Sequence, residues 1–89
     1  MPRYFFHVDN GKFIADQSGT ELPDLAAARR EAVRSAGQMI DDTQQSFWEH
    51  MTPWNMHVTD SDDRLLFTLS FSTKIPSGSA RFIPDQKPR

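Results

Sequence analysis

The 89-residue chain contains no cysteine, which excludes disulfides and thiolate metal sites. It also lacks any run approaching the roughly 20 apolar residues of a membrane span. Its first residues, MPRYFFHVDNGK, have no continuous apolar stretch of the kind found in secretion signals. We therefore expect a cytoplasmic protein that has no membrane association. A chain this short forms a single small domain.

Positive charge is scarce over most of the chain. Residues 1–71 carry six Lys/Arg against eleven Asp/Glu, whereas residues 72–89 carry four against one. An acidic body is a poor platform for phosphate backbones, which bind to clustered Lys and Arg. Nucleic acid is therefore not an expected partner of the body, and only the basic tail could contact one.

Motifs that carry catalytic or metal chemistry are also lacking. There is no phosphate-binding glycine loop or nucleophile elbow, and Glu49-His50 lacks the H-E-x-x-H spacing of a zinc site. The acidic turn at 60–63 does not fit a calcium loop, because its required glycine and glutamate positions hold Leu65 and Phe71. We expect neither an enzyme nor a bound cofactor or metal.

The first elements of the chain read as a β-hairpin. RYFFHV, at 3–8, is aromatic and β-branched, a composition that favours a strand. Asn10-Gly11 suits the positive φ angles of a type I′ turn, and 12–16 is the natural return strand.

A long helix should follow the stretch GTELPD at 19–24. Gly19 suits a left-handed turn, Pro23 the first helical position, and Asp24 the positive end of the helix. Apolar residues then recur at helical spacing and predict a helix from about Pro23 to Asp42. The segment 43–53 reads as either one more helical turn or an ordered loop. The element GTELPD is thus more simply explained as architecture than as an acid–base group.

Two further strands complete the domain. Apolar and polar residues alternate over 54–60 and over 64–71, with the turn DSDD between them. The order is ββαββ, an α+β fold with a four-stranded, mostly antiparallel sheet and one long helix packed on one face. We expect strand order 2-1-3-4, a domain at 1–73, and a flexible, basic, Pro/Ser-rich tail at 74–89.

Alternation assigns side chains to the two faces of this sheet. The face beneath the helix is expected to hold the larger apolar set: Tyr4, Phe6, Val8, Phe13, Ala15, Trp54, Met56, Val58, Leu65, Phe67, Leu69 and Phe71. The opposite face is mixed, as is typical of a partly solvated antiparallel sheet: Phe5, His7, Ile14, Asn55, His57, Leu66, Thr68 and Ser70.

The linear pattern resembles a family of short bacterial proteins, the domain of unknown function 6894. The resemblance rests on MPRYFFHV, the DNG turn, GTELPDLAAARREAVRSAGQMI, and FW before a W-x-M-x-V-T-D strand. It covers about residues 2 to 73, and the turn DSDD departs from the glycine-containing turn usual in the family. The resemblance supports the fold and implies no activity, substrate, cofactor or catalytic residue.

Two groups of residues are candidate binding surfaces. The first is an interface on the face without a helix, formed by Phe5, His7, Ile14, His57, Leu66 and Thr68. The second is a ligand corner near the end of the helix, formed by Trp48, Met51 and Trp54, which could equally seal the open end of a small core.

The absence of a catalytic set and the apolar residues on a face without a helix predict a small non-enzymatic interaction module. It should self-associate, most simply as a two-fold homodimer through this face or an adjacent edge, or bind a protein partner. The alternatives are a small-molecule or metal-responsive binder that uses the His7/His57 face or the Trp48/Trp54 corner, and a nucleic-acid accessory that uses its basic tail.

Overall fold

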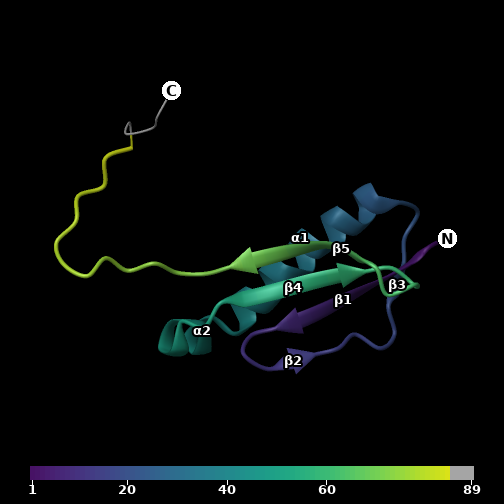
Figure 1. Cartoon of the computed structure of the whole chain (residues 1–89), viewed down its shortest axis with the longest axis horizontal. Helices are drawn as coiled ribbons and strands as arrows, with labels where there is room; N and C mark the ends of the chain where they lie inside the picture. The colour runs from purple at the N-terminus through teal and green to yellow at the C-terminus, as the bar shows by residue number, and fades with distance from the viewer. Residues whose placement is uncertain (85–89) are drawn as a thin grey trace.

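A single helical layer covers one side of an antiparallel sheet in the computed structural model, which describes residues 1–84 (Figure 1). The α+β class is confirmed. The elements follow one another as β1 (Arg3–Asp9), β2 (Phe13–Ile14), β3 (Thr20–Glu21), α1 (Leu25–Asp42), α2 (Gln44–His50), β4 (Trp54–Thr59) and β5 (Leu65–Phe71). Among residues 1–84, none of the helices has the length and apolar character needed to cross a membrane.

The main path of the sheet runs β2-β1-β4-β5, and every pairing in it is antiparallel. For the four strands expected from the sequence, this is the predicted order 2-1-3-4. The sheet differs in one detail, because the short strand β3 was not predicted. It pairs with β1 through Arg3–Glu21 and Tyr4–Thr20, on the same side as β2.

The first hairpin departs from its prediction. Cα pairing of Asp9 with Phe13 leaves the three residues 10–12 in the loop, where only Gly11 has a positive φ, of 99°. The prediction of a type I′ turn is therefore wrong, because that turn requires a positive φ at two residues. The return strand is also shorter than expected, because it ends at Ile14. Two residues later, the carboxylate of Asp16 accepts the N–H of Phe6, which a backbone carbonyl of a longer strand would otherwise accept.

The stretch GTELPD is confirmed as architecture. Asp24 is the N-cap of α1, and its Oδ1 accepts the N–H of Ala27 at 2.9 Å. Gly19 has a φ of 72°, the left-handed turn expected of it. Pro23 is not the first helical residue, because the helix begins at Leu25, after the extended cap.

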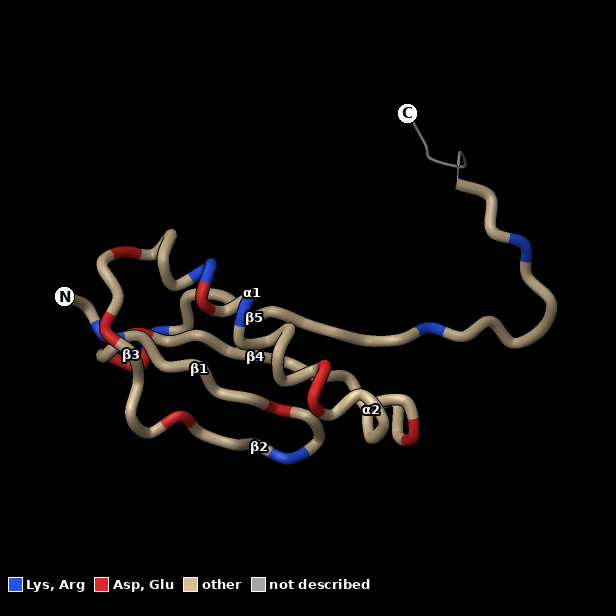
Figure 2. The backbone as a smooth tube through the Cα atoms, turned by 180° about the vertical axis from the view of Figure 1, so that it is seen from behind, with Lys and Arg blue, Asp and Glu red and all other residues tan. Residues whose placement is uncertain are grey.

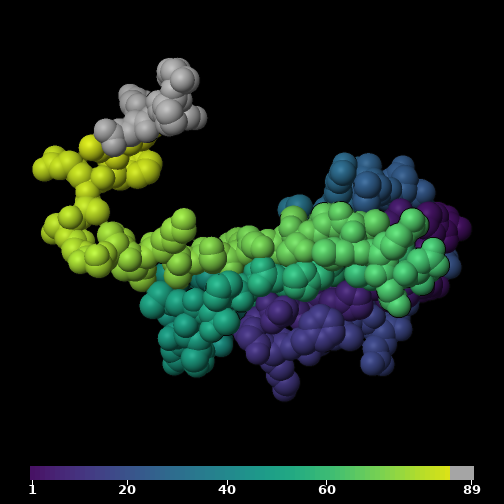
Figure 3. All heavy atoms as spheres, viewed as in Figure 1, coloured from purple at the N-terminus to yellow at the C-terminus, as the bar shows by residue number. Residues whose placement is uncertain are grey.

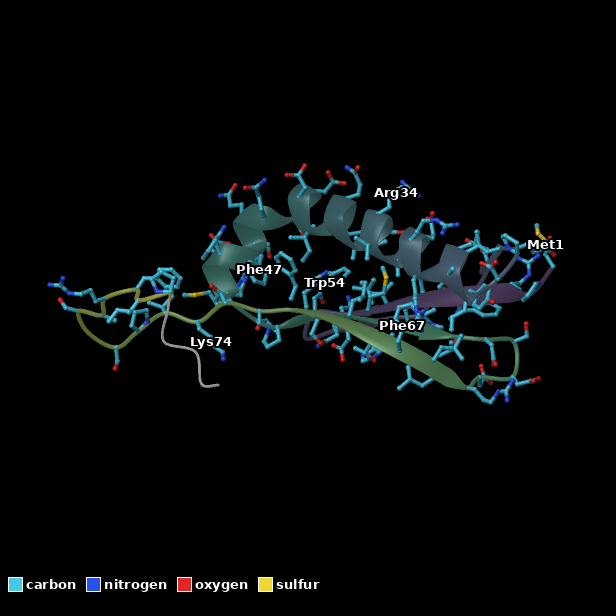
Figure 4. The ribbon with its side chains drawn as sticks, turned by 90° about the horizontal axis from the view of Figure 1, so that it is seen from above. Met1, Arg34, Phe47, Trp54, Phe67 and Lys74 are labelled. Atoms are coloured by element: carbon cyan, nitrogen blue, oxygen red, sulfur yellow. The ribbon has the colours of Figure 1, made fainter. Side chains whose placement is uncertain are left out.

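Small residues let α1 lie close to the sheet. Ala28 and Ala32 are completely buried against a sheet core that contains the completely buried Met56 and Val58. Figure 4 shows the helix above the sheet, with Trp54 between the layers and Arg34 on the outer side. The ambiguous segment after α1 is helical over α2, and the residue that caps its C-terminus, Met51, has the left-handed conformation, with a φ of 51°.

Residues 72–84 form neither a helix nor a strand and extend away from the body (Figure 1). Ile75, Phe82 and Ile83 are 64%, 88% and 50% exposed. The last part of the predicted tail, 85–89, lies outside the residues that the structure describes.

Truncation after Thr73 should change the midpoint of thermal unfolding by less than about 2 °C, because the removed apolar side chains are exposed. Differential scanning calorimetry of the full and truncated chains measures this. A loss of several degrees would show that the tail packs on the body.

Candidate functional site

The side of the sheet that α1 does not cover has an uncharged centre, which we call the helix-free face. Its central members come from β1, β4 and β5: Phe5, His7, Asn55, His57, Thr59, Thr68 and Ser70. Charged residues of the strands stand at strand ends, as Arg3 and Asp9 do in β1 and Glu21 in β3. Figure 2 shows that the middles of β1, β4 and β5 carry no charge. The face thus has a charged rim around an uncharged centre.

The predicted place of Ile14 on this face is wrong. Ile14 pairs with Val8, whose buried side chain faces α1, and Phe13 pairs with Asp9 instead. A one-residue change of register moves every side chain to the other face of a strand. The three-residue loop therefore places Phe13 on the helix-free face and Ile14 on the side of α1.

The predicted place of Leu65 beneath the helix is also wrong. Val58 pairs with Phe67 but Thr59 pairs with Leu65, so Leu66 is an extra residue at a β-bulge. Pairing with Thr59 puts Leu65 on the helix-free face, where it is 62% exposed. Alternation back from Phe67, which packs against the core, leaves Leu66 on the same face.

The two histidines of the face are direct cross-strand neighbours, as predicted, because His7 pairs with His57. The backbone N–H of Asp16 donates to Nδ1 of His7 at 3.1 Å. The ring proton of neutral His7 must then lie on Nε2, which donates to the hydroxyl oxygen of Thr59 at 3.1 Å. His57 Nδ1 shares a 2.9 Å hydrogen bond with the hydroxyl of Thr68.

These contacts bear on the metal-binding alternative. Both nitrogens of His7 are engaged, so the ring has no free lone pair for a metal in this arrangement. Among residues 1–84, no three His, Cys, Asp or Glu side chains gather as metal ligands.

Aromatic rings form a row across the face. The rings of Phe5 and His7 are stacked with centroids 6.3 Å apart and planes 7° from parallel. His7 and Phe13 follow at 5.8 Å and 29°. Phe13 ends the row and is 60% exposed. The row offers a flat apolar strip bordered by the hydroxyls of β4 and β5.

Asp16 holds one end of this row in place. Its carboxylate accepts backbone N–H groups of Phe6, Ser18 and Gly19, each at 3.1 Å. Partial burial acts to raise the pKa of Asp16, but these bonds and nearby His7 outweigh it and hold the pKa below its ordinary value of 3.8. Asp16 thus has a structural role, since it fills the gap between β2 and β3 and orients His7.

The predicted ligand corner is not one site. Trp54 is 5% exposed and lines a hollow of about 300 Å³ with residues of α2. Trp48 is 57% exposed and lines a different hollow, next to Phe71. Met51 lines neither. Phe47, which lies on the sheet side of its helix in Figure 4, lines both hollows and contacts Phe71 edge-to-face at 5.8 Å.

One apolar groove was missed from the sequence. It lies between α1 and β5, has a volume of about 250 Å³, and is lined by Val33, Ala36, Gly37, Trp54, Leu69, Ser70 and Phe71. The helical periodicity identified the buried stripe of α1 but did not show which sheet edge a single helix leaves uncovered.

The comparison with protein families decides the assignment. Residues 3–72 match the family described as Domain of unknown function (DUF6894). The chain belongs to this family. The match spans β1 through β5 and ends where the exposed tail begins. No curated protein and no solved structure matches the chain. The description of this family names no function, so we infer one from the surfaces of the molecule.

Proposed function

We propose that this member of the DUF6894 family is a small non-enzymatic interaction module that binds a protein partner through its helix-free face. The observation that carries the proposal is the uncharged centre of that face. Protein interfaces are depleted of charge and enriched in aromatic side chains at their centre, with a polar rim. The row of Phe5, His7 and Phe13 inside a charged rim has this composition.

Hydrogen bonds also hold two side chains of the face where a partner would contact it. Backbone and hydroxyl groups fix the ring of His7, and a hydroxyl fixes His57. Side chains that are already held lose little conformational entropy on binding, so more of the contact energy appears as affinity. Figure 3 views the molecule from this side, where β1, β4 and β5 lie open to solvent.

The test uses two neighbouring residues of β2 that have similar exposure and lie on opposite faces. Phe13 is 60% exposed on the helix-free face, and Ile14 is 51% exposed on the side of α1. A photo-crosslinking amino acid at position 13 or position 14, introduced in the cell of origin, identifies proteins that contact each face. A protein captured from position 13 is then purified and titrated with the wild-type chain, Phe13→Asp and Ile14→Asp.

Phe13→Asp should weaken binding about tenfold or more, which is about 1.4 kcal/mol, whereas Ile14→Asp should change it less than about twofold. The same loss in both variants would contradict the proposal. Crosslinks to a protein from position 14 alone would contradict it as well.

A further inference from the structure

The outer edge of β5 presents unpaired backbone groups whose identity follows from the hydrogen bonds of β1. The N–H of Phe6 donates to Asp16, on the side of β1 away from β4. Successive residues of a strand point their backbone groups to opposite sides, so His7 bonds toward its neighbour His57 in β4. The backbone N–H and C=O groups of His57 are thus directed toward β1 and away from its other strand neighbour, Thr68 in β5. Thr68 and Ser70 therefore direct their N–H and C=O groups away from β4.

Nothing in the described chain covers this edge. β5 is the last strand of the sheet path within residues 1–84. From Leu65 to Thr73 the sequence has neither a charge nor a proline, the features that usually protect an open edge. Protection is limited to the bulge at Leu66, which leaves Phe67–Phe71 in regular register with β4.

An apolar groove accompanies the open edge. The groove between α1 and β5 adjoins Leu69 and Phe71, and the latter is 50% exposed. Val33 lines its helical wall and is 64% exposed on a helix whose sheet side is otherwise Ala-rich. A strand added to β5 would place every second side chain at this groove.

We propose that a second copy of this chain occupies the edge, with the two β5 strands paired antiparallel about a two-fold axis. In β5, the side chains of Phe67, Leu69 and Phe71 lie on the side of α1. Two-fold pairing would put the partner's Leu69 and Phe71 on that same side, beside the apolar groove. The sheet then continues through both copies, with both long helices on one face. The two helix-free faces join into one.

Charge selects the antiparallel direction. The turn before β5 carries Asp60, Asp62 and Asp63 against Arg64 alone, which pairs with Asp60 at 3.0 Å, so its net charge is −2. The Asp62 side chain is 80% exposed, whereas Lys74 follows the far end of the strand (Figure 4). Antiparallel pairing brings the turn of each copy beside the partner's Lys74. Parallel pairing would instead bring Lys74 beside the partner's Lys74, and like charges in register oppose pairing.

The pairing uses the backbone edge of β5 and the groove beside α1, whereas the proposed protein partner contacts side chains of the helix-free face, so either proposal can fail without the other. Light scattering after size exclusion gives the mass of the full chain, which should be twice 10.2 kDa. Ser70→Pro removes an N–H that points away from β4 and also the 2.7 Å hydrogen bond that the Ser70 hydroxyl donates to Asn55 Oδ1, a bond that Ser70→Ala removes as well. The backbone groups through which β5 bonds to β4 belong to the neighbouring residues, so the fold should persist while the dimer dissociation constant rises about tenfold or more. Ser70→Ala keeps that N–H and should change the constant less than about threefold.

The groove has its own matched pair. Val33→Glu adds a negative charge at the proposed seam and should also raise the dissociation constant about tenfold or more. Gln38→Glu adds the same charge elsewhere on exposed α1 and should leave the constant nearly unchanged. Circular dichroism confirms that each variant is folded.

Charge exchange tests the direction of pairing. Asp62→Lys and Lys74→Asp should each weaken the dimer, and the double variant should recover most of the loss, which only the antiparallel arrangement explains. A wild-type mass of one chain at high concentration would overturn the proposal. Dissociation by Phe82→Asp with Ile83→Asp, with Ser70→Pro having no effect, would also overturn it, because the tail rather than β5 would then join the copies.

Discussion

Met56→Ala should lower the free energy of unfolding by about 2–5 kcal/mol, a large stability effect for a domain of this size. Met56 is completely buried in the central strand β4, and Ala28 and Ala32 pack on the same core from the helix. These alanines have no long side chains that could fill the space left by the methionine. Because stability in small domains is modest, the variant should approach the limit of folding.

Urea unfolding followed by far-ultraviolet circular dichroism measures this loss. Met39→Ala is the matched control, since Met39 is 38% exposed on α1 and should lose less than about 1 kcal/mol. Equal losses in the two variants would mean that the core does not lie between α1 and β4 as described.

Asp16→Ala should lower the free energy of unfolding by about 2 kcal/mol, because it leaves three backbone N–H groups without their acceptor. Of these three hydrogen bonds, those from Phe6 and Gly19 are partly buried, whereas that from Ser18 is exposed to water. The loss should spread to the helix-free face, since the backbone of Asp16 orients His7. A change in the NMR chemical shifts of the His7 ring, in either direction, would report that effect.

The contribution of Asp16 should depend on pH with a definite sign. Its pKa in the folded chain lies below 3.8, so the ionised carboxylate stabilises the fold well above that pH. This stabilisation is lost as the pH falls through the folded pKa. The difference in stability between wild type and Asp16→Asn should therefore be constant near neutral pH and shrink below pH 3.8. A difference that persists unchanged in strong acid would contradict the role assigned to the carboxylate.

Periodicity in the sequence was enough to predict the order and class of the main elements. The alternation over 54–60 and 64–71 and the helical stripe after Asp24 lead directly to β4, β5 and α1. The cross-strand pair His7–His57 could also be predicted, because it depends only on the order of the strands and on their antiparallel direction.

Register could not be predicted where one residue decides it. The loop at 10–12 has three residues rather than two, which exchanges Phe13 and Ile14 between faces. The bulge at Leu66 has the same consequence for Leu65. Strand β3 was hidden for a different reason. A two-residue strand has no periodicity to detect, and its place depends on Asp16 bridging the gap before it.

The surfaces of the molecule therefore depend on details that lie between the predicted elements. Phe13 completes the aromatic row only because of its loop, and the groove beside β5 exists only because one helix cannot cover the sheet. The two proposed contacts, with a protein partner and with a second copy, rest on these features.

Amide hydrogen exchange at Thr68 and Ser70, measured residue by residue at several protein concentrations, tests most directly whether the chain works through such contacts. We expect both amides to be protected at high concentration and to exchange rapidly on dilution, because within residues 1–84 no backbone group accepts them and the proposed second copy would supply the acceptors. The amides of Phe67 and Leu69, which point toward β4, should stay protected throughout. Rapid exchange at Thr68 and Ser70 at every concentration would contradict the account.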